Sequence, residues 1–304
     1  MNKSETNFKL DFIGIGFPRS GTTWLANNIA AHPEVDFAKH KETNFFLTKN
    51  SEVFSKESLL YLSQMRPPDF KTYLNEFTHN GDIKGEFGVY YIYDRYALNL
   101  LKRKFPDIKV LICIRNPVDC LESSYYFVRS SHIGYTLNDN YLEEVLNSPN
   151  QLYSIERAKY YEHVRFCKHL FGDKLKIILF EDIKSNPEKV LKDVYKFLGV
   201  TNLFFPENYG KKVNETLTMR NKSLMKVVHK IIYLIRRSPF NRVLYDFINK
   251  DSTVLRVYNK LMKKSGQREY FSTEAKEKLV NLLKKDIKKL DNIVDFDLSL
   301  WLKL

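Results

Sequence analysis

The chain lacks most features that mark secreted, disulfide-stabilised or membrane-spanning proteins. Its 304 residues include three cysteines, Cys113, Cys120 and Cys167, and no CxxC spacing, which argues against a disulfide framework. It contains no apolar run of about 18 residues that would predict a transmembrane helix. Residues 1–12 are polar and lack the apolar core of a signal peptide. We therefore expect a cytoplasmic protein, with association at a membrane surface as the alternative.

Internal repeats, low-complexity segments and Gly/Ser-rich linkers are also missing from the sequence. Because nothing forces a domain boundary, we expect one domain over residues 1–304. Its α/β nucleotide-binding core would occupy residues 1–210. Residues 211–304 would form a helical C-terminal part of the same domain.

Apolar runs alternate with helical patterns along most of the chain. The expected strands are 9–16, 82–91, 109–114 and 176–180, and the expected helices are 22–31, 117–129, 151–171, 187–198, 224–235 and 272–290. Such alternation favours a parallel sheet with helices on both faces. We therefore predict an α/β, P-loop-like three-layer fold, in which helices flank a central parallel sheet and a helical, basic C-terminal region follows.

The positive charge is concentrated in one part of the chain. The net charge is +13, and residues 211–290 hold 21 of the Lys and Arg residues against 7 Asp and Glu. This imbalance indicates an anionic partner: a nucleotide, an acidic glycan, a nucleic acid or an anionic membrane surface. The alternative is that most of these lysines simply cover solvated helix faces.

The stretch FIGIGFPRSGTTW, residues 12–24, has the glycine spacing of a P-loop but lacks its lysine. Gly16 and Gly21 are correctly spaced, and Thr22 stands where a nucleoside triphosphatase has lysine. The later strand KVLICI ends in Arg115 rather than an aspartate that would hold Mg²⁺. A loop that has gained Arg19 and opens a helix predicts a site for an anion bound without a metal.

Two motifs together resemble the sulfotransferases that use 3′-phosphoadenosine 5′-phosphosulfate (PAPS). The stretch GFPRSGTTWL is similar to the family's 5′-phosphosulfate loop, and RNPVDCLES is similar to its 3′-phosphate motif, with Arg115 followed eight residues later by Ser123. The segments LFEDIKSNPEKVLKDVYKFLGV and DFDLSLW also resemble family members, the latter those from bacteria. The resemblance covers essentially the whole chain and implies PAPS as the sulfuryl donor.

The resemblance also implies which residues hold the donor. The loop residues are Arg19, Ser20, Gly21, Thr22, Thr23 and Trp24, with Trp24 near the adenine or simply packing its helix on the sheet. Arg115 and Ser123 would bind the 3′-phosphate, for which the guanidinium offers a planar fork of donors. Arg220, in NETLTMRNKS, resembles the basic residue of a late loop that closes over the nucleotide.

Two residues are implied to take part in the chemistry. Arg19 resembles the residue that stabilises the bridging oxygen electrostatically as the bond to sulfur breaks. Glu42, in FAKHKETNFF, resembles the catalytic base in the ExxFF element of glucosaminyl sulfotransferases. Two departures concern that branch: Asn44 replaces a histidine found in some relatives, and Phe87 replaces a lysine.

Other interpretations of this region remain open. Glu42 could be a surface carboxylate paired with Lys41 or Lys39, and His40 or His163 could supply the base instead. Lys84 falls on the opposite face of its strand from residue 87 and is a poor substitute for the missing lysine.

We expect an enzyme that sulfates a hydroxyl of a carbohydrate or glycolipid, similar to the glycan-type branch. The enzymatic alternative is sulfation of a lipid or of a small phenolic or alcohol metabolite. A P-loop nucleotide kinase is disfavoured by Thr22 and by the missing acidic strand end. The non-enzymatic alternative is a basic membrane-surface or nucleic-acid-binding protein; no nucleic-acid-binding motif is present, and we expect no nucleic acid partner.

Overall fold

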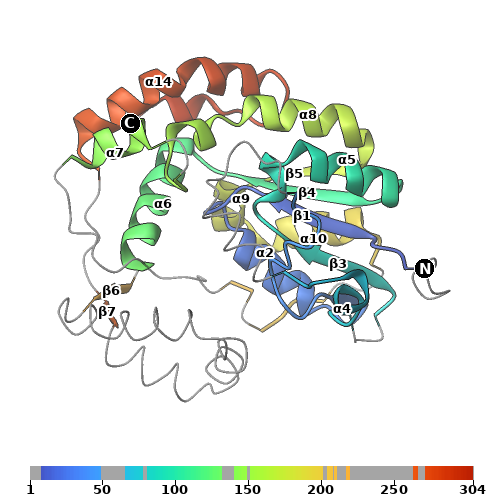
Figure 1. Ribbon diagram of the computed structural model, residues 1–304. Coiled ribbons are helices and arrows are strands. Elements are labelled where there is room, and N and C mark those ends of the chain that lie inside the picture. Colours follow the sequence, from blue (N-terminus) through green and yellow to red (C-terminus); the bar gives the residue numbers. More distant parts are fainter. Residues whose placement is uncertain are drawn as a thin grey trace.

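The computed structural model of the chain describes residues 8–48, 66–77, 81–131, 140–148, 151–200, 204–207, 209–210, 217–219, 263–265 and 271–303. The five main strands are β1 (Phe12–Gly16), β2 (Val35–Phe37), β3 (Ile83–Phe87), β4 (Lys109–Ile114) and β5 (Leu175–Leu179). They form one parallel sheet in the order β2-β3-β1-β4-β5. A separate antiparallel pair joins β6 (Leu217–Met219) to β7 (Lys263–Ser265) (Figure 1).

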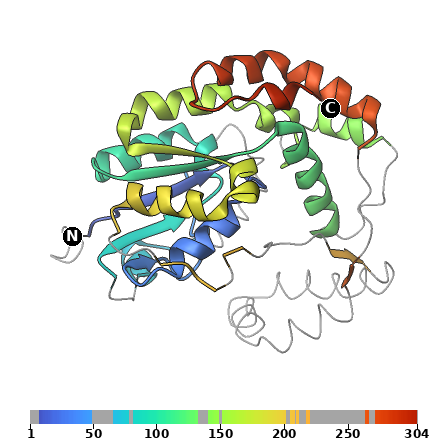
Figure 2. The same cartoon turned by 180° about the vertical axis from the view of Figure 1, so that it is seen from behind.

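Helices cover both faces of the sheet. The α-helices are α2 (Thr22–Ala30), α4 (Phe70–Leu74), α5 (Arg95–Lys104), α6 (Pro117–Ser131), α7 (Tyr141–Asn147), α8 (Tyr161–Phe171), α9 (Phe180–Ser185), α10 (Pro187–Leu198) and α14 (Thr273–Asp291). The 3₁₀ turns are η1 (Tyr91–Tyr93), η2 (Ile155–Ala158), η3 (Gly172–Lys174) and η4 (Ser299–Leu302). Figures 1 and 2 show α5 and α8 on one face with α14 outside them, and α2 and α10 on the other. The predicted α/β fold is confirmed.

Two apolar cores hold these layers together. One joins the sheet to α5, α6, α8 and α14 through residues such as Ile112, Leu121 and Leu283. The other joins it to α2 and α10 through residues such as Leu25 and Leu191. A sheet that is buried on both faces explains why β1 and β4 are nearly continuous apolar runs.

Local signals in the sequence fix several helix ends. The side chains of Asp94, Asn186 and Ser272 accept hydrogen bonds from the first-turn amides of α5, α10 and α14. Gly199 ends α10 with a left-handed φ of 84°. The expected helices 187–198 and 272–290 are therefore found almost as predicted.

The C-terminal helix is hydrogen-bonded to the core. Asp286 of α14 accepts the amides of Tyr160 at 2.8 Å and Tyr161 at 3.2 Å, where α8 begins. Glu122 of α6 accepts the amide of Phe271 at 2.6 Å. These bonds attach residues 271–303 to the helices that flank the sheet. That residues 1–304 form one domain stays a prediction.

Some element boundaries differ from the sequence predictions. The expected strand 82–91 ends at Phe87, and Tyr91 lies in η1. The expected helix 151–171 is interrupted, because α8 starts only at Tyr161, where Asp286 takes up the free amides. Strand β2 and helices α4, α5, α7 and α9 were not predicted. The expected helix 224–235 lies outside the described residues.

Candidate active site

The predicted anion loop lies where the strand order of the sheet reverses. From β1 the chain moves toward β2 and β3 on one side, whereas from β4 it moves to β5 on the other. In open α/β sheets, ligands bind outside the carboxyl ends of the strands at such a switch point. The loop 17–21 follows β1 and Arg115 follows β4, so both predicted anion-binding elements reach this crevice.

The loop has the backbone form of an anion cradle. Arg19 and Gly21 have left-handed φ values of 64° and 86°. A Cβ on Gly21 would lie 2.8 Å from the ring of Phe180, so this position needs glycine for space as well as for φ. Helix α2 starts at Thr22 without a side-chain cap or an acidic first-turn residue. Its positive end is therefore directed at the crevice.

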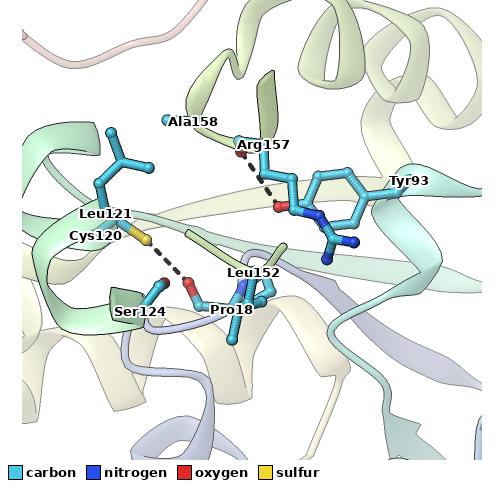
Figure 3. Close-up of a pocket in the computed structure, with 8 residues that line it drawn as sticks. All are labelled: Pro18, Tyr93, Cys120, Leu121, Ser124, Leu152, Arg157 and Ala158. Carbon is cyan, nitrogen blue, oxygen red and sulfur yellow. Dashed lines mark hydrogen bonds between the residues drawn. The ribbon is translucent and has the colours of Figure 1, made fainter. Parts of the chain in front are cut away.

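A small pocket behind the loop shows how α6 supports it (Figure 3). The residues lining the pocket are Pro18, Tyr93, Cys120, Leu121, Ser124, Leu152, Arg157 and Ala158. The thiol of Cys120 donates to the Pro18 carbonyl at 3.0 Å, and the Tyr93 hydroxyl donates to the Arg157 carbonyl at 3.3 Å. The first of these bonds ties the loop to α6, and Cys120 therefore has a supporting role.

Arg115 connects the end of β4 to the loop. Its Nη1 donates to the Arg19 carbonyl and its Nη2 to the Asp119 carboxylate, both at 3.3 Å, and its guanidinium lies 4.5 Å from the ring centre of Phe180. Its Nε is buried and has no hydrogen-bond partner among the described residues. A buried cationic donor without an acceptor is costly, so this atom indicates a place for an anionic ligand.

Ser123 and Arg19 complete the same cluster. The Arg19 Nε donates to the Ser123 Oγ at 3.2 Å, and the Arg19 guanidinium lies 4.7 Å from the ring centre of Phe127 on α6. The structure thus brings Arg19 to Arg115 and Ser123, which are 96 and 104 positions away in sequence.

The remaining residues predicted for the donor are placed differently. The Trp24 indole is almost fully buried and donates to the Tyr209 carbonyl at 2.7 Å, so this side chain packs α2 and holds a later segment. Ser20 and Thr22 are buried in the loop, and Thr23 is half-buried. Arg220 lies outside the described residues.

Glu42 lies at the same carboxyl edge of the sheet, beyond β3. Its amide donates to the Phe87 carbonyl at 2.7 Å, and its backbone has a left-handed φ of 68°. The carboxylate is 33% exposed and forms a 2.6 Å ion pair with Lys41. The lysine pairing that the sequence allowed is therefore present, and it leaves part of the carboxylate accessible.

The two alternative histidines occupy less suitable surroundings. His40 is 75% exposed and pairs with Glu76 at 2.9 Å. His163 packs edge-on against the rings of Phe17 and Tyr93, and burial lowers the pKa of its imidazole to about 4. A ring held among aromatic side chains has a packing role, which favours Glu42 over both histidines.

Sequence reasoning missed several partners of the site. Asp119 pairs with Arg115, and Glu181 accepts the Asn116 amide at 3.1 Å, which holds the turn after β4. Glu86 is fully buried beneath the segment that carries Glu42. Glu86 could have been noticed as a carboxylate inside the short strand IKGEF, and Asp119 by its i,i+4 spacing from Arg115, whereas Glu181 carries no local signal.

The described residues contain neither a metal-ligand cluster nor a membrane-spanning helix. In the part of the chain that the structure describes, no His, Cys, Asp and Glu residues cluster as metal ligands. Over the same residues, no helix combines the length and apolarity needed to cross a bilayer.

Known proteins that resemble this chain include sulfotransferases. A family model described as "Sulfotransferase domain" matches residues 9–230. Sulfotransferase 6B1 of Pan troglodytes is 28% identical over 110 residues, which are 35% of this chain and 34% of that protein. The membrane-associated sulfotransferase kil1 of Dictyostelium discoideum is 20% identical over 328 aligned positions, covering 79% of this chain and 65% of that protein.

A solved structure shares the fold. The sulfotransferase from Alicyclobacillus acidocaldarius superposes with a TM-score of 0.67 at 20% identity, covering 97% of this chain and 99% of that one. The match to the chimpanzee protein spans only about a third of that relative's length.

Proposed function

This chain belongs to the sulfotransferase family, and on that premise we propose that it transfers a sulfuryl group from PAPS to the hydroxyl of an acceptor. The observation that carries the proposal is the meeting of Arg19, Arg115 and Ser123 at the switch point of the sheet. Three donors from separate elements converge there on one crevice beside a helix N-terminus.

The residues present fit the donor. The amides at the start of α2 and the Ser20 and Thr22 hydroxyls suit a 5′-phosphosulfate. Arg115, with its buried unpartnered Nε, and Ser123 suit a 3′-phosphate. Trp24 and Arg220 are proposed to contact the nucleotide, although Trp24 also holds its helix in place.

PAPS, when bound, supplies the sulfuryl group and departs as the 3′,5′-bisphosphate. Arg19 stabilises the negative charge that develops at the loop, because its guanidinium remains protonated at any working pH. Its contact with Ser123 places this charge beside the other predicted phosphate donor. Because arginines and helix amides stabilise the developing negative charge, we propose a reaction without a metal ion.

Glu42 is proposed as the general base that takes the proton of the acceptor hydroxyl. Its support is its place at the carboxyl edge of the sheet, its partial exposure, the pairing of His40 with Glu76 and the packing role of His163. The neighbouring Lys41 pairs with the carboxylate at 2.6 Å and leaves part of it accessible to an acceptor.

For the acceptor we propose a carbohydrate or glycolipid, because KETNFF resembles the glycan-type base element. A small phenolic or alcohol metabolite is the alternative. The excess of 21 basic over 7 acidic residues in 211–290 supports contact with an acidic glycan or an anionic membrane surface. A cytoplasmic location with peripheral membrane contact is part of this proposal.

The test combines donor binding with label transfer. We expect 3′-phosphoadenosine 5′-phosphate (PAP) to raise the Tm of the protein, and [35S]PAPS to label at least one member of a panel of neutral oligosaccharides, amino-sugar oligosaccharides, a galactolipid and 2-naphthol. Retention on heparin with no stabilisation by PAP would contradict the enzyme and favour a purely basic binding protein.

A further inference from the structure

Glu86 is a buried carboxylate that the proposed reaction does not yet use. It lies in β3, and its side chain is completely shielded from solvent. Three hydroxyl groups donate to it: Thr43 Oγ1, Tyr73 OH at 3.3 Å and Tyr91 OH at 3.2 Å. They come from the segment after β2, from α4 and from η1, so one carboxylate joins three elements to the sheet.

The segment tied down in this way is the one that carries Glu42. Thr43, the next residue along, is the donor to Glu86, and its hydroxyl also accepts the Phe45 amide at 3.3 Å. Tyr91, a second donor to Glu86, accepts the Phe46 amide at 3.4 Å. Glu86 therefore holds both ends of the stretch 43–46 through its hydroxyl partners.

This stretch needs support because its backbone is strained. Glu42 and Asn44 have left-handed φ values of 68° and 54°, which cost energy in residues other than glycine. Packing provides part of the support, since the ring of Phe45 stacks on that of Tyr73 with centres 4.6 Å apart. The Glu86 hydrogen bonds lie at the centre of the strained segment and fix the residue between the two left-handed positions.

We propose that Glu86 is a positioning residue: its carboxylate fixes residues 42–46 so that the Glu42 side chain is held toward the acceptor. The inference rests on the proposed role of Glu42 as base. Misplacing a reacting group by about 1 Å can lower the reaction rate about 100-fold. The hydrogen bonds to Glu86 should therefore affect the transfer step and not the binding of the donor.

The ionised carboxylate suits this role better than the acid. A carboxylate only accepts hydrogen bonds, and all three hydroxyls can donate to it; a carboxylic acid must donate one bond itself and displaces a donor. Burial raises the pKa of Glu86 to about 7, the hydroxyls of Thr43, Tyr91 and Tyr73 oppose this, and the charge of Glu76 adds to it. As pH falls through about 7, protonation weakens the bonds from these hydroxyls but removes the larger cost of burying the charge.

The first experiment needs no acceptor. Hydrogen exchange of segment 42–46 is compared in wild type, Glu86→Gln and the matched pair Thr43→Ser and Thr43→Val. We expect faster exchange in Glu86→Gln and Thr43→Val, no change in Thr43→Ser, which keeps the hydroxyl, and unchanged protection of β4 in all of them. Wild-type exchange rates in segment 42–46 of both Glu86→Gln and Thr43→Val would overturn the proposal. Thr43→Val serves if Glu86→Gln does not fold.

The second experiment asks whether Glu86 acts through Glu42. Single-turnover rates are measured with [35S]PAPS and the panel acceptor that is labelled fastest, and PAP affinity is measured in parallel. We expect Glu86→Gln to lower the rate about 10- to 100-fold at unchanged PAP affinity, and to lower it little further in a Glu42→Gln background. Equal losses in both backgrounds would overturn the proposal. A normal rate for Glu42→Gln alone would overturn the base assignment, while the exchange experiment still decides whether Glu86 fixes the segment.

Discussion

The proposed donor side and the proposed acceptor side of the site are built in different ways. On the donor side, Arg115 directly follows β4 and Arg19 lies in the loop after β1, and the Arg115 side chain contacts the Arg19 carbonyl. On the acceptor side, Glu42 lies in an irregular segment after β2 that is held by the buried Glu86. One side therefore depends on a few direct contacts, and the other on an indirect chain of hydrogen bonds.

This difference predicts different responses to substitution. Loss of a donor-side contact should weaken PAP binding by the free energy of that one contact. A lost acceptor-side support should leave PAP affinity unchanged and lower the rate, because it displaces Glu42, which we propose to act only in the transfer step.

Glu42→Gln should give the largest effect. The substitution keeps the size of the side chain and removes the proton acceptor, so we expect the rate of transfer to fall about 10²- to 10⁴-fold with nearly unchanged PAP affinity. Single-turnover kinetics with [35S]PAPS measures it. If Glu42 were only a surface partner of Lys41, a pair of about 0–1 kcal/mol, the rate would stay within about threefold of wild type.

The pH dependence of stability should report Glu86 directly. Its pKa is raised by burial from 4.5 in the unfolded chain to about 7 in the folded protein. The folded state therefore keeps this proton between these two values while the unfolded state releases it. As a result, the contribution of Glu86 to the free energy of unfolding falls as pH rises from 4.5 to about 7, and it is constant above about 7.

We expect the free energy of unfolding of wild type relative to Glu86→Gln to fall by about 3 kcal/mol between pH 4 and pH 8. Urea unfolding at each pH measures this difference. The exposed Glu277→Gln serves as the control for loss of one carboxylate. A difference that stays flat with pH would contradict the burial effect on Glu86.

Arg115→Ala should weaken PAP binding on the donor side. A hydrogen bond to a charged group is worth about 1.5–3 kcal/mol, which corresponds to a loss of about 10- to 150-fold in affinity. Calorimetry with PAP measures the loss, and Arg103→Ala, an exposed arginine on α5, is the matched control. Equal losses for PAP and for AMP would mean that Arg115 does not bind the 3′-phosphate.

Ser123→Ala should give the smallest effect of the series. A hydroxyl that donates to phosphate contributes about 0.5–1.5 kcal/mol, so PAP affinity should fall about 2- to 12-fold. The same titration with AMP should show no change. A loss larger than that of Arg115→Ala would indicate that Ser123 mainly supports Arg19, its present partner at 3.2 Å.

The donor side could be predicted from sequence because its signals are local. A strand, a glycine-spaced loop and a helix start are adjacent in the chain, and the parallel sheet brings the ends of β1 and β4 to one edge. Arg19, Arg115 and Ser123 therefore followed from two short motifs. Their partners were missed for different reasons: Asp119 stands at the i,i+4 position from Arg115, a local signal that was overlooked, whereas Glu181 is about 65 positions away and leaves no local pattern.

The acceptor side could be predicted only in part. Glu42 followed from the resemblance of KETNFF, but its support by Glu86, Tyr73 and Tyr91 depends on how α4 and η1 pack. The strand after Asp82 was expected to run to Tyr91; it ends at Phe87, and the turn that follows directs the Tyr91 hydroxyl back toward Glu86. Such contacts arise from tertiary packing, which periodicity does not encode.

The measurement that most directly tests the account is the affinity of the wild-type protein for PAP compared with AMP. The account predicts that PAP binds about 10- to 150-fold more tightly, because the cluster of Arg115 and Ser123 recognises a second phosphate that AMP lacks. Equal affinity for the two nucleotides would contradict it, since the convergence of these residues would then have no ligand to explain it.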